Sequence, residues 1–222
     1  MPFICVYRRI IRQLRLLILL CVILLLGACA GKQEPYPDLV TEFADMRTDA
    51  NGIFRNMTID DGTSFSITNT NIKPHHPNAT YRVVVGFVPN TSGSRPEAEI
   101  YTLTGAYVLA DSTTIVSHAP TSIESMWKKG EYINMQLTAK TQGGTHFWGY
   151  AIDSIQVIGK SGRTHSHFHL SIHHNQGNDP LSYSQTFYCS VPISKIEAYQ
   201  PNDTISVSVH TFNGVRRWMF LE

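Results

Sequence analysis

The stretch that decides the fold is TISVSVHTF at residues 204–212, followed by the turn Asn213-Gly214 and by VRRWMF at residues 215–220. Apolar and polar residues alternate along the first run, and a period of two residues is typical of a strand with one buried face. Asn-Gly between two such runs is the strongest short signal for a β-hairpin. The stretch therefore predicts two antiparallel strands, and we expect Trp218 and Phe220 to close a hydrophobic core.

Similar patterns recur upstream of this hairpin, at residues 132–139, 145–157, 163–173 and 182–191. The clearest is the first, in which Ile133, Met135, Leu137 and Ala139 alternate with more polar residues. About seven short strands over about 100 residues are typical of an antiparallel β-sandwich. We therefore assign residues 121–222 to a β-sandwich domain.

The first half of the chain also reads as strands, which we expect at residues 39–47, 53–60, 63–68, 81–88 and 99–109. Five short strands in so small a region are typical of an OB-like barrel, which we assign to residues 38–110. Residues 111–120 have no strand pattern and end in proline, so they are predicted to be a linker. The predicted fold class is all-β, a small OB-like five-stranded barrel followed by an antiparallel β-sandwich.

The amino terminus has the features of a bacterial secretory signal. Arginines at positions 8, 9, 12 and 15 precede an apolar run at residues 16–26, and small residues lead to Cys29 in Leu26-Gly27-Ala28-Cys29. The apolar run is shorter than the roughly 20 residues that a spanning helix needs. We expect residues 1–28 to be a lipoprotein signal peptide, Cys29 to be the site of lipid attachment, and residues 29–37 to be a polar tether.

The net charge and the cysteine content argue against two properties, nucleic-acid binding and an intramolecular disulfide. The net charge is +1, and the four leader arginines account for more than that, so the remaining body is slightly acidic and nucleic acid is not an expected partner. Cys5 and Cys21 lie in the leader and Cys29 would carry lipid. Cys189 alone remains, so the mature body has no intramolecular disulfide, and we expect a buried, inert thiol.

Seven stretches, spread from about residue 38 to the end, have the order and spacing of one known family. They are Thr58-Ile59-Asp60-Asp61-Gly62-Thr63, Gly130-Glu131-Tyr132-Ile133-Asn134, Lys140-Thr141-Gln142-Gly143-Gly144, Phe147-Trp148-Gly149-Tyr150, His174-Asn175-Gln176, Asn178-Asp179-Pro180 and Val209-His210-Thr211-Phe212. Together they resemble the NigD-like family of bacterial lipoproteins. The resemblance implies an OB-like amino-terminal domain and a carboxy-terminal β-sandwich, and an immunity role is suggested for the family through a bacteriocin operon. It implies no particular reaction.

The densest group of chemically active residues is the histidine run at residues 163–174. On a strand, His165, His167, His169 and His173 share one face, opposite Phe168, Leu170 and Ile172. Neutral imidazoles at alternate positions could converge on Zn²⁺ or Cu²⁺. A second interpretation is a solvated polar face that is rich in histidine, and no carboxylate that would orient the rings is identifiable from the sequence. A third is a pH-responsive face, because several histidines would become charged together below about pH 6.5. We expect no cofactor unless this face binds metal.

Two further groups are candidates for ligand contact. His75 and His76 lie between prolines in a predicted loop, and such loops on an OB-like barrel often line a ligand cleft. Trp148 and Tyr150 could stack on a sugar or peptide, although residues of this kind more often belong to a sandwich core. The usual serine-hydrolase and metalloprotease motifs are absent from the sequence, so an enzyme is not expected.

The sequence therefore predicts a cell-envelope lipoprotein held to the membrane by its amino-terminal lipid. Its expected role is non-catalytic binding or scaffolding, with an envelope protein, peptide or glycan as partner and an immunity-type role as one version. The alternative is a periplasmic metal-binding protein that uses the histidine face. The residues after Cys29 lack an acidic run, which favours an anchor facing the periplasm over one exposed at the cell surface.

Overall fold

A computed structural model describes residues 37–69, 75–112, 117–160 and 163–221. Within these ranges the chain forms β-strands and one short 3-10 helix, η1 (Ile193–Lys195), with no α-helix, so the all-β prediction is confirmed. No helix in the same ranges is long and apolar enough to cross a membrane. The predicted signal peptide, Cys29 and all but the last residue of the predicted tether lie outside the described residues.

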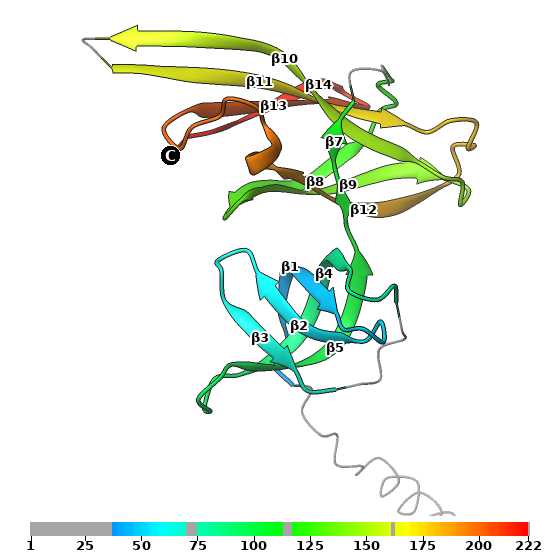
Figure 1. The fold of residues 1–222 in the computed structure, drawn as a ribbon. Helices are drawn as coiled ribbons and strands as arrows, with labels where there is room; N and C mark the ends of the chain where they lie inside the picture. The colour runs from blue at the N-terminus through cyan, green and yellow to red at the C-terminus, as the bar shows by residue number, and fades with distance from the viewer. Residues whose placement is uncertain (1–36, 70–74, 113–116, 161–162, 222) are drawn as a thin grey trace, which may run out of the picture. The chain divides into compact units, whose positions relative to one another are not determined.

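The first five strands form a closed barrel with the order β1-β2-β3-β5-β4 (Figure 1). Strands β1 and β4 close it by antiparallel pairing, whereas β3 and β5 run parallel. This is the five-stranded, OB-like barrel that the turn and strand pattern predicted. The strands are β1 (Val40–Thr48), β2 (Phe54–Ile59), β3 (Ser64–Ile67), β4 (Thr80–Asn90) and β5 (Glu97–Gly105).

The remaining strands form two sheets, one with the order β14-β13-β11-β10-β7 and one with the order β6-β12-β9-β8. Most neighbours are antiparallel, but β11 and β13 run parallel because the chain crosses to the other sheet as β12 before it returns. The strands are β6 (Tyr107–Val108), β7 (Ala110–Asp111), β8 (Ser122–Lys129), β9 (Tyr132–Thr141), β10 (Phe147–Lys160), β11 (Arg163–Asn175), β12 (Tyr183–Pro192), β13 (Thr204–Thr211) and β14 (Gly214–Phe220).

Two details differ from the strands that the sequence predicts. The strand expected at residues 99–109 ends at Gly105, and the next residues already pair with the sandwich, β6 with β12 and β7 with β10. Strand β8 was not anticipated, because its sequence SIESMWKK mixes polar and apolar residues without a clear period. The predicted domain boundaries at residues 110 and 120 stay a prediction, since residues 39–222 form a single compact unit.

The sandwich core is built from the alternating residues of its strands. On β9, Ile133, Met135, Leu137 and Ala139 are all buried, as the period of two predicted. Trp218 and Phe220 of the last hairpin are partly buried and pack against the same core, which confirms the role expected of them. Cys189 of β12 is a free thiol that is fully buried, and burial raises its pKa far above the usual range. The prediction that this thiol is buried is confirmed, and its inertness stays a prediction.

A buried network joins the barrel to the sandwich through Arg82 of β4, whose side chain is 1% exposed. Its guanidinium forms an ion pair of 2.7 Å with Asp60 and donates hydrogen bonds to Asn134 (3.0 Å) and Ser190 (3.2 Å) of the sandwich. Asn134 in turn donates to Asp60 at 2.6 Å, and the ring of Tyr132 lies 3.7 Å from the guanidinium carbon. Because each of these buried polar groups has partners, the network is a structural connection and not an open site.

Candidate functional site

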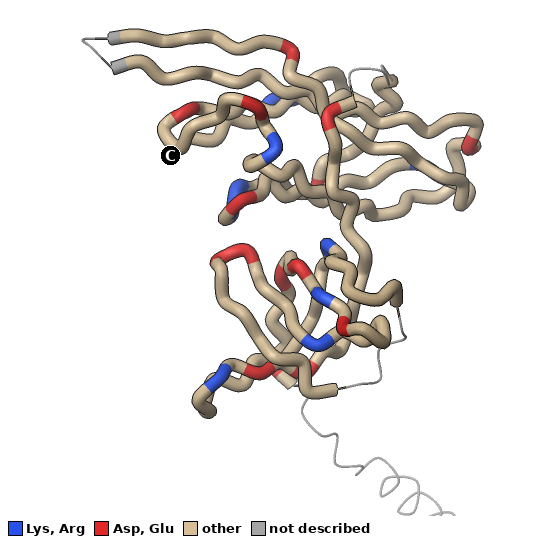
Figure 2. Tube along the Cα trace, viewed as in Figure 1, with Lys and Arg blue, Asp and Glu red and all other residues tan. Residues whose placement is uncertain are grey.

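Strand β11 carries four of its five histidines on the face of the sheet that points away from the core. Phe168, Leu170 and Ile172 are buried in the sandwich core. Alternate residues of a strand point to opposite faces, so the residues between them lie on the outer face. His165, His167, His169 and His173 therefore share one face, as the sequence predicted. Few charged residues accompany them, and the long β10–β11 hairpin is almost entirely tan in Figure 2.

The structure does not bring these four side chains to one point. The rings of His167 and His169 lie 4.0 Å apart, whereas His173 packs beside His118. Nδ1 of His169 is already hydrogen-bonded to Ser206 at 2.8 Å. Among the described residues, no three histidine, cysteine, aspartate or glutamate side chains are grouped so that they could hold a metal ion. The reason is the extended strand, because six residues at about 3.3 Å each place the backbone of His173 about 20 Å from that of His167.

A groove of about 500 Å³ lies on the same outer face. Ser171 of β11 and Ser208 of β13 lie opposite each other in the strand register, and both are small and buried. Larger side chains from six other positions surround them, so the sheet is hollowed at this point. The residues that line the groove are His118, Ala151, Asp153, Ser171, His173, Ser208, His210, Val215 and Arg217.

Asp153 reaches this groove because β10 contains a β-bulge. The pairing of β10 with β11 shifts between Ile152 and Ser154, so Asp153 has no partner in the register. A bulge inserts one residue and redirects its side chain. The Asp153 carboxylate accepts a hydrogen bond of 2.8 Å from the hydroxyl of Ser171. This bond fixes the position of the hydroxyl proton.

The hydrogen bonds define which nitrogen of His173 carries the proton. The Ser171 hydroxyl donates to Asp153, so it can only accept from His173 Nε2, which lies 3.3 Å away. In the neutral imidazole, Nε2 therefore carries the hydrogen and Nδ1 is a bare acceptor. His173 is 5% exposed, and its Nδ1 is buried without a partner among the described residues. A buried polar atom without a partner is costly, and it marks a site that an external group could complete.

Serine, histidine and aspartate are the residue types of a hydrolase triad, but here they are connected differently. In a triad, histidine accepts the serine proton and aspartate orients the histidine. In this groove the proton of Ser171 points to Asp153, and His173 donates to the hydroxyl that it would have to activate. The arrangement is suited to binding and not to nucleophilic attack.

Two histidines that sequence reasoning did not single out complete the groove. His118 stacks on His210 with ring centres 4.1 Å apart, and it meets His173 edge-on at 5.0 Å. Burial and the neighbouring His210 and His173 lower the pKa of His118, although Asp153 acts in the opposite direction. His118 is therefore neutral at neutral pH. The sequence could have placed His210 on the outer face, because it continues the alternation of Ser206 and Ser208. His118 lies in the predicted linker, where no periodic pattern indicates which way its side chain points.

Comparison with known families identifies the architecture. The family model of the NigD-like C-terminal beta sandwich domain matches residues 100–220. The chain belongs to the NigD-like family. No match is found among curated proteins.

Solved structures share the NigD-like fold at low sequence identity. A NigD-like immunity protein from Bacteroides caccae is 19% identical, with a TM-score of 0.62 over 85% of this chain and 99% of that chain. A Bacteroides vulgatus protein of unknown function is 12% identical, with a TM-score of 0.64 over 83% and 90%. A candidate lipoprotein from Bacteroides fragilis is 14% identical, with a TM-score of 0.58 over 83% and 97%. At these identities the likeness establishes the fold and nothing more.

Two of the stretches that carry the NigD-like resemblance meet at the Arg82 network. Asp60 belongs to the first stretch and Asn134 to the second, and their side chains are hydrogen-bonded to each other. Gly130 begins the second stretch with a φ of 55°, and a Cβ there would collide with the backbone oxygen of Asp60. These two stretches therefore contain residues of the junction between the barrel and the sandwich, and not residues of the outer groove.

A second histidine cluster lies on the inner side of the same sheet in the NigD-like sandwich. His174 bonds Ala119 O through Nδ1 (3.0 Å) and His146 Nδ1 through Nε2 (2.8 Å). His146 Nε2 lies 3.0 Å from the Asp179 carboxylate. Burial lowers the pKa of His174 to about 4, and hydrogen bonds from Thr141, His146 and Gln142 lower that of Asp179 to about 2. Each ring nitrogen of the two histidines has a partner.

The predicted aromatic platform belongs to this inner side. Trp148 stacks on His174 with ring centres 4.0 Å apart and 11° between the planes, and Tyr150 is 1% exposed. Tyr150 is a core residue, so a ligand cannot reach its ring without opening the sandwich. The interpretation of these two residues as core is the one that their positions favour.

His75 and His76 lie on the barrel, far along the chain from the groove, and both are exposed. The ring of His75 packs against Phe54 and Tyr81, with centres 4.7 and 5.0 Å apart. The backbone N–H of His76 donates to the Tyr81 hydroxyl at 3.0 Å. These contacts hold the loop against the barrel, and the predicted ligand role of His75 and His76 stays a prediction.

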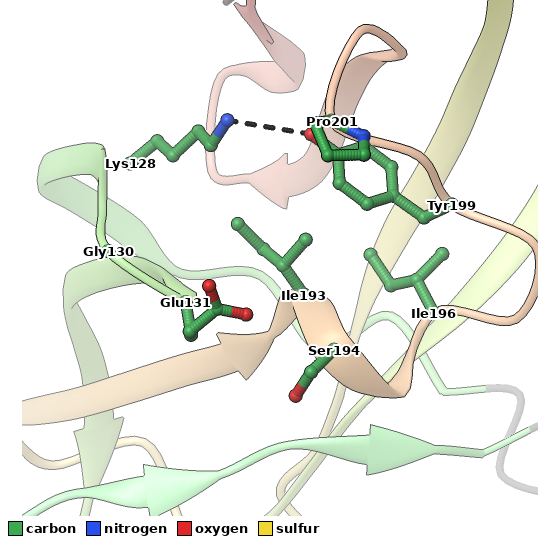
Figure 3. Close-up of a pocket in the computed structure, with 8 residues that line it drawn as sticks. All are labelled: Lys128, Gly130, Glu131, Ile193, Ser194, Ile196, Tyr199 and Pro201. Carbon is green, nitrogen blue, oxygen red and sulfur yellow. Dashed lines mark hydrogen bonds between the residues drawn. The ribbon is translucent and has the colours of Figure 1, made fainter.

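A smaller hollow of about 240 Å³ lies at the end of the sandwich where η1 follows β12 (Figure 3). Lys128 reaches across it toward the hydroxyl of Tyr199 at 3.5 Å, while Ile193 and Ile196 form its apolar side. None of the buried atoms that lack partners in the described chain lies in this hollow. The outer groove is therefore the stronger candidate for a binding site.

Proposed function

We propose that this protein is a lipid-anchored component of the bacterial cell envelope that binds a ligand or partner without catalysis, through the outer groove of its five-stranded sheet. The observation that carries the binding role is the buried, unpartnered Nδ1 of His173 in a groove of about 500 Å³. That volume falls within the range of about 300–1,000 Å³ that is usual for ligand sites. The Asp153–Ser171–His173 arrangement supports the non-catalytic part of the proposal.

The anchor follows from the leader sequence, with Cys29 as the lipid-bearing residue and the periplasmic side as the proposed location. Two structural neighbours support the assignment to the cell envelope, since one is described as a candidate lipoprotein and another as an immunity protein. An immunity-type role would be one form of the binding function, in which the groove takes part in sequestering a toxin or shielding its target.

The anchor is tested by replacing Cys29 with alanine in the full-length protein. We expect the wild-type protein to incorporate labelled palmitate and to sediment with membranes, and Cys29→Ala to lose both properties. The matched control is Cys21→Ala, which removes a leader cysteine and should leave labelling and sedimentation unchanged. Membrane association and labelling of the Cys29→Ala variant at the wild-type level would contradict the anchor.

A further inference from the structure

The hydrogen-bonding groups of the outer groove specify the chemistry of its ligand. His173 offers a bare acceptor at Nδ1, so a ligand atom that completes it must donate a hydrogen bond. Asp153 is an acceptor only, and its Oδ1 is bonded to Ser171. Arg217 is a donor only, and its Nε is bonded to Ser208 at 3.2 Å. A ligand must therefore donate at one side of the groove and accept at the other.

The charges of the groove are balanced. Asp153 contributes one negative charge and Arg217 contributes one positive charge. The histidines that face them are His118 from the segment before β8, His173 from β11 and His210 from β13, and burial together with His210 and His173 lowers the pKa of His118. The negative charge of Asp153 and the positive charge of Arg217 offset each other, so complementarity points to a ligand without net charge.

A hydroxyl group is the simplest ligand group that both donates and accepts. We infer that the outer groove binds a neutral, polyhydroxylated ligand, that is a glycan, with one hydroxyl donating to Nδ1 of His173. This inference rests on the proposed binding function and names its ligand class. Val215, which is 57% exposed, and the stacked rings of His118 and His210 supply apolar surface for the C–H face of a sugar ring.

The experiment is an NMR titration of the soluble body that starts after Cys29, observed at the imidazole signals of His118, His173 and His210. Three probes are used separately, a mixture of maltohexaose, cellohexaose and laminarihexaose, a mixture of heparin oligosaccharides, and an uncharged glycine–serine peptide. We expect the neutral oligosaccharides to shift these signals and to leave the ring signals of His146 and His174 in place, because those two rings are fully partnered inside the sandwich.

The decisive variant is His173→Phe, which keeps a ring of similar size and removes Nδ1. Ser171 still donates to Asp153 in this variant, so the floor of the groove keeps its hydrogen bond. Loss of one buried ligand hydrogen bond should weaken oligosaccharide binding about tenfold. The matched control is His165→Ala on the same strand and face but outside the groove, which should bind as the wild type does. Circular dichroism and thermal unfolding of both variants exclude loss of fold as the cause.

The outcomes separate the ligand class from the binding function. A response to heparin or to the peptide alone would overturn the glycan assignment and leave the groove as a binding site. Equal affinity of His173→Phe and wild type for the neutral oligosaccharides would also overturn it, because Nδ1 would then have no role. The absence of any response to all three probes would overturn both the assignment and the binding role of the groove.

Discussion

His173 and His174 are neighbours in the chain, but they lie on opposite sides of the five-stranded sheet and have different hydrogen-bond partners. On the inner side, His174, His146 and Asp179 form a chain in which each ring nitrogen has a partner. On the outer side, His173 has a partner at Nε2 and none at Nδ1 in the described structure. The difference between the two residues is therefore whether the surrounding protein completes the hydrogen bonds of the ring, and the proposed binding role of His173 rests on that difference.

The contrast between His173 and His174 should appear most strongly in the free energy of unfolding. His174→Phe keeps the stacking surface for Trp148 but leaves the backbone oxygen of Ala119 and Nδ1 of His146 without partners. We expect the free energy of unfolding to fall by about 2–4 kcal/mol, since each buried orphan costs about 1–3 kcal/mol. The matched variant His173→Phe should change it by less than about 1 kcal/mol. Urea denaturation of both variants checks this, and equal losses would show that the two rings are not different in kind.

A fall in pH should destabilise the fold through the cluster of His174, His146 and Asp179 on the inner side of the sheet. The pKa of His174 is lowered from 6.5 to about 4 by burial, so the unfolded chain binds its proton more readily than the fold does. Stability should therefore fall as the pH drops from about 6.5 to 4, by about 2–3 kcal/mol. The lowered pKa of Asp179 adds a loss between about pH 4 and 2. Urea denaturation at a series of pH values measures both, and an unchanged profile between pH 6.5 and 4 in His174→Phe would refute the assignment of the first loss.

The outer groove should also respond to acid through ligand binding. Protonation of His118, whose pKa is lowered by burial and by the neighbouring His210 and His173, places a positive charge in a groove that already holds Arg217. We expect the affinity for a neutral oligosaccharide to fall about tenfold between pH 7.5 and a pH well below 6.5, where His118 is protonated. Calorimetry at the two pH values is the measurement. Binding that grows stronger in acid would indicate an anionic ligand instead.

The smallest effect expected is that of metal ions on the outer face. His167 and His169 lie side by side, but His165 and His173 do not join them, and a tight zinc site needs about four ligands. Calorimetric titration of the untagged, chelator-treated body with Zn²⁺ or Cu²⁺ should therefore give binding weaker than about micromolar. Stoichiometric binding tighter than that, lost in the double variant His167→Ala/His169→Ala, would restore the metal-binding alternative.

Local patterns predicted a large part of this molecule. The period of two residues on β9 and β11 identified the residues that face the sandwich core, and the Asn213-Gly214 turn predicted the last hairpin. Cys189 was expected to be buried, and it is. These features depend on residues close together in the chain, and the sequence carries that information directly.

The groove could not be predicted because tertiary pairing creates it. His210 lies beside His173 only because β13 pairs in parallel with β11 after a crossover through β12. Parallel strands are not joined by a tight turn, so no local sequence signal predicts their register. His118 reaches the site through a single bridge between His118 and His174. The bulge that directs Asp153 toward Ser171 has no glycine or proline to signal it. Arg82 could not be singled out either, because it lies inside the mainly apolar run that was predicted as a strand at residues 81–88.

The central claim is that two adjacent histidines hold opposite tautomers, and one spectrum tests it directly. His173 should carry its proton on Nε2 and leave Nδ1 bare, whereas His174 should carry its proton on Nδ1 and accept at Nε2. A long-range ¹H–¹⁵N correlation spectrum of the soluble body at neutral pH distinguishes protonated from bare ring nitrogens. The account predicts opposite patterns for the two residues. A proton on Nδ1 of His173 would contradict it, because the groove would then hold no acceptor for a ligand hydroxyl.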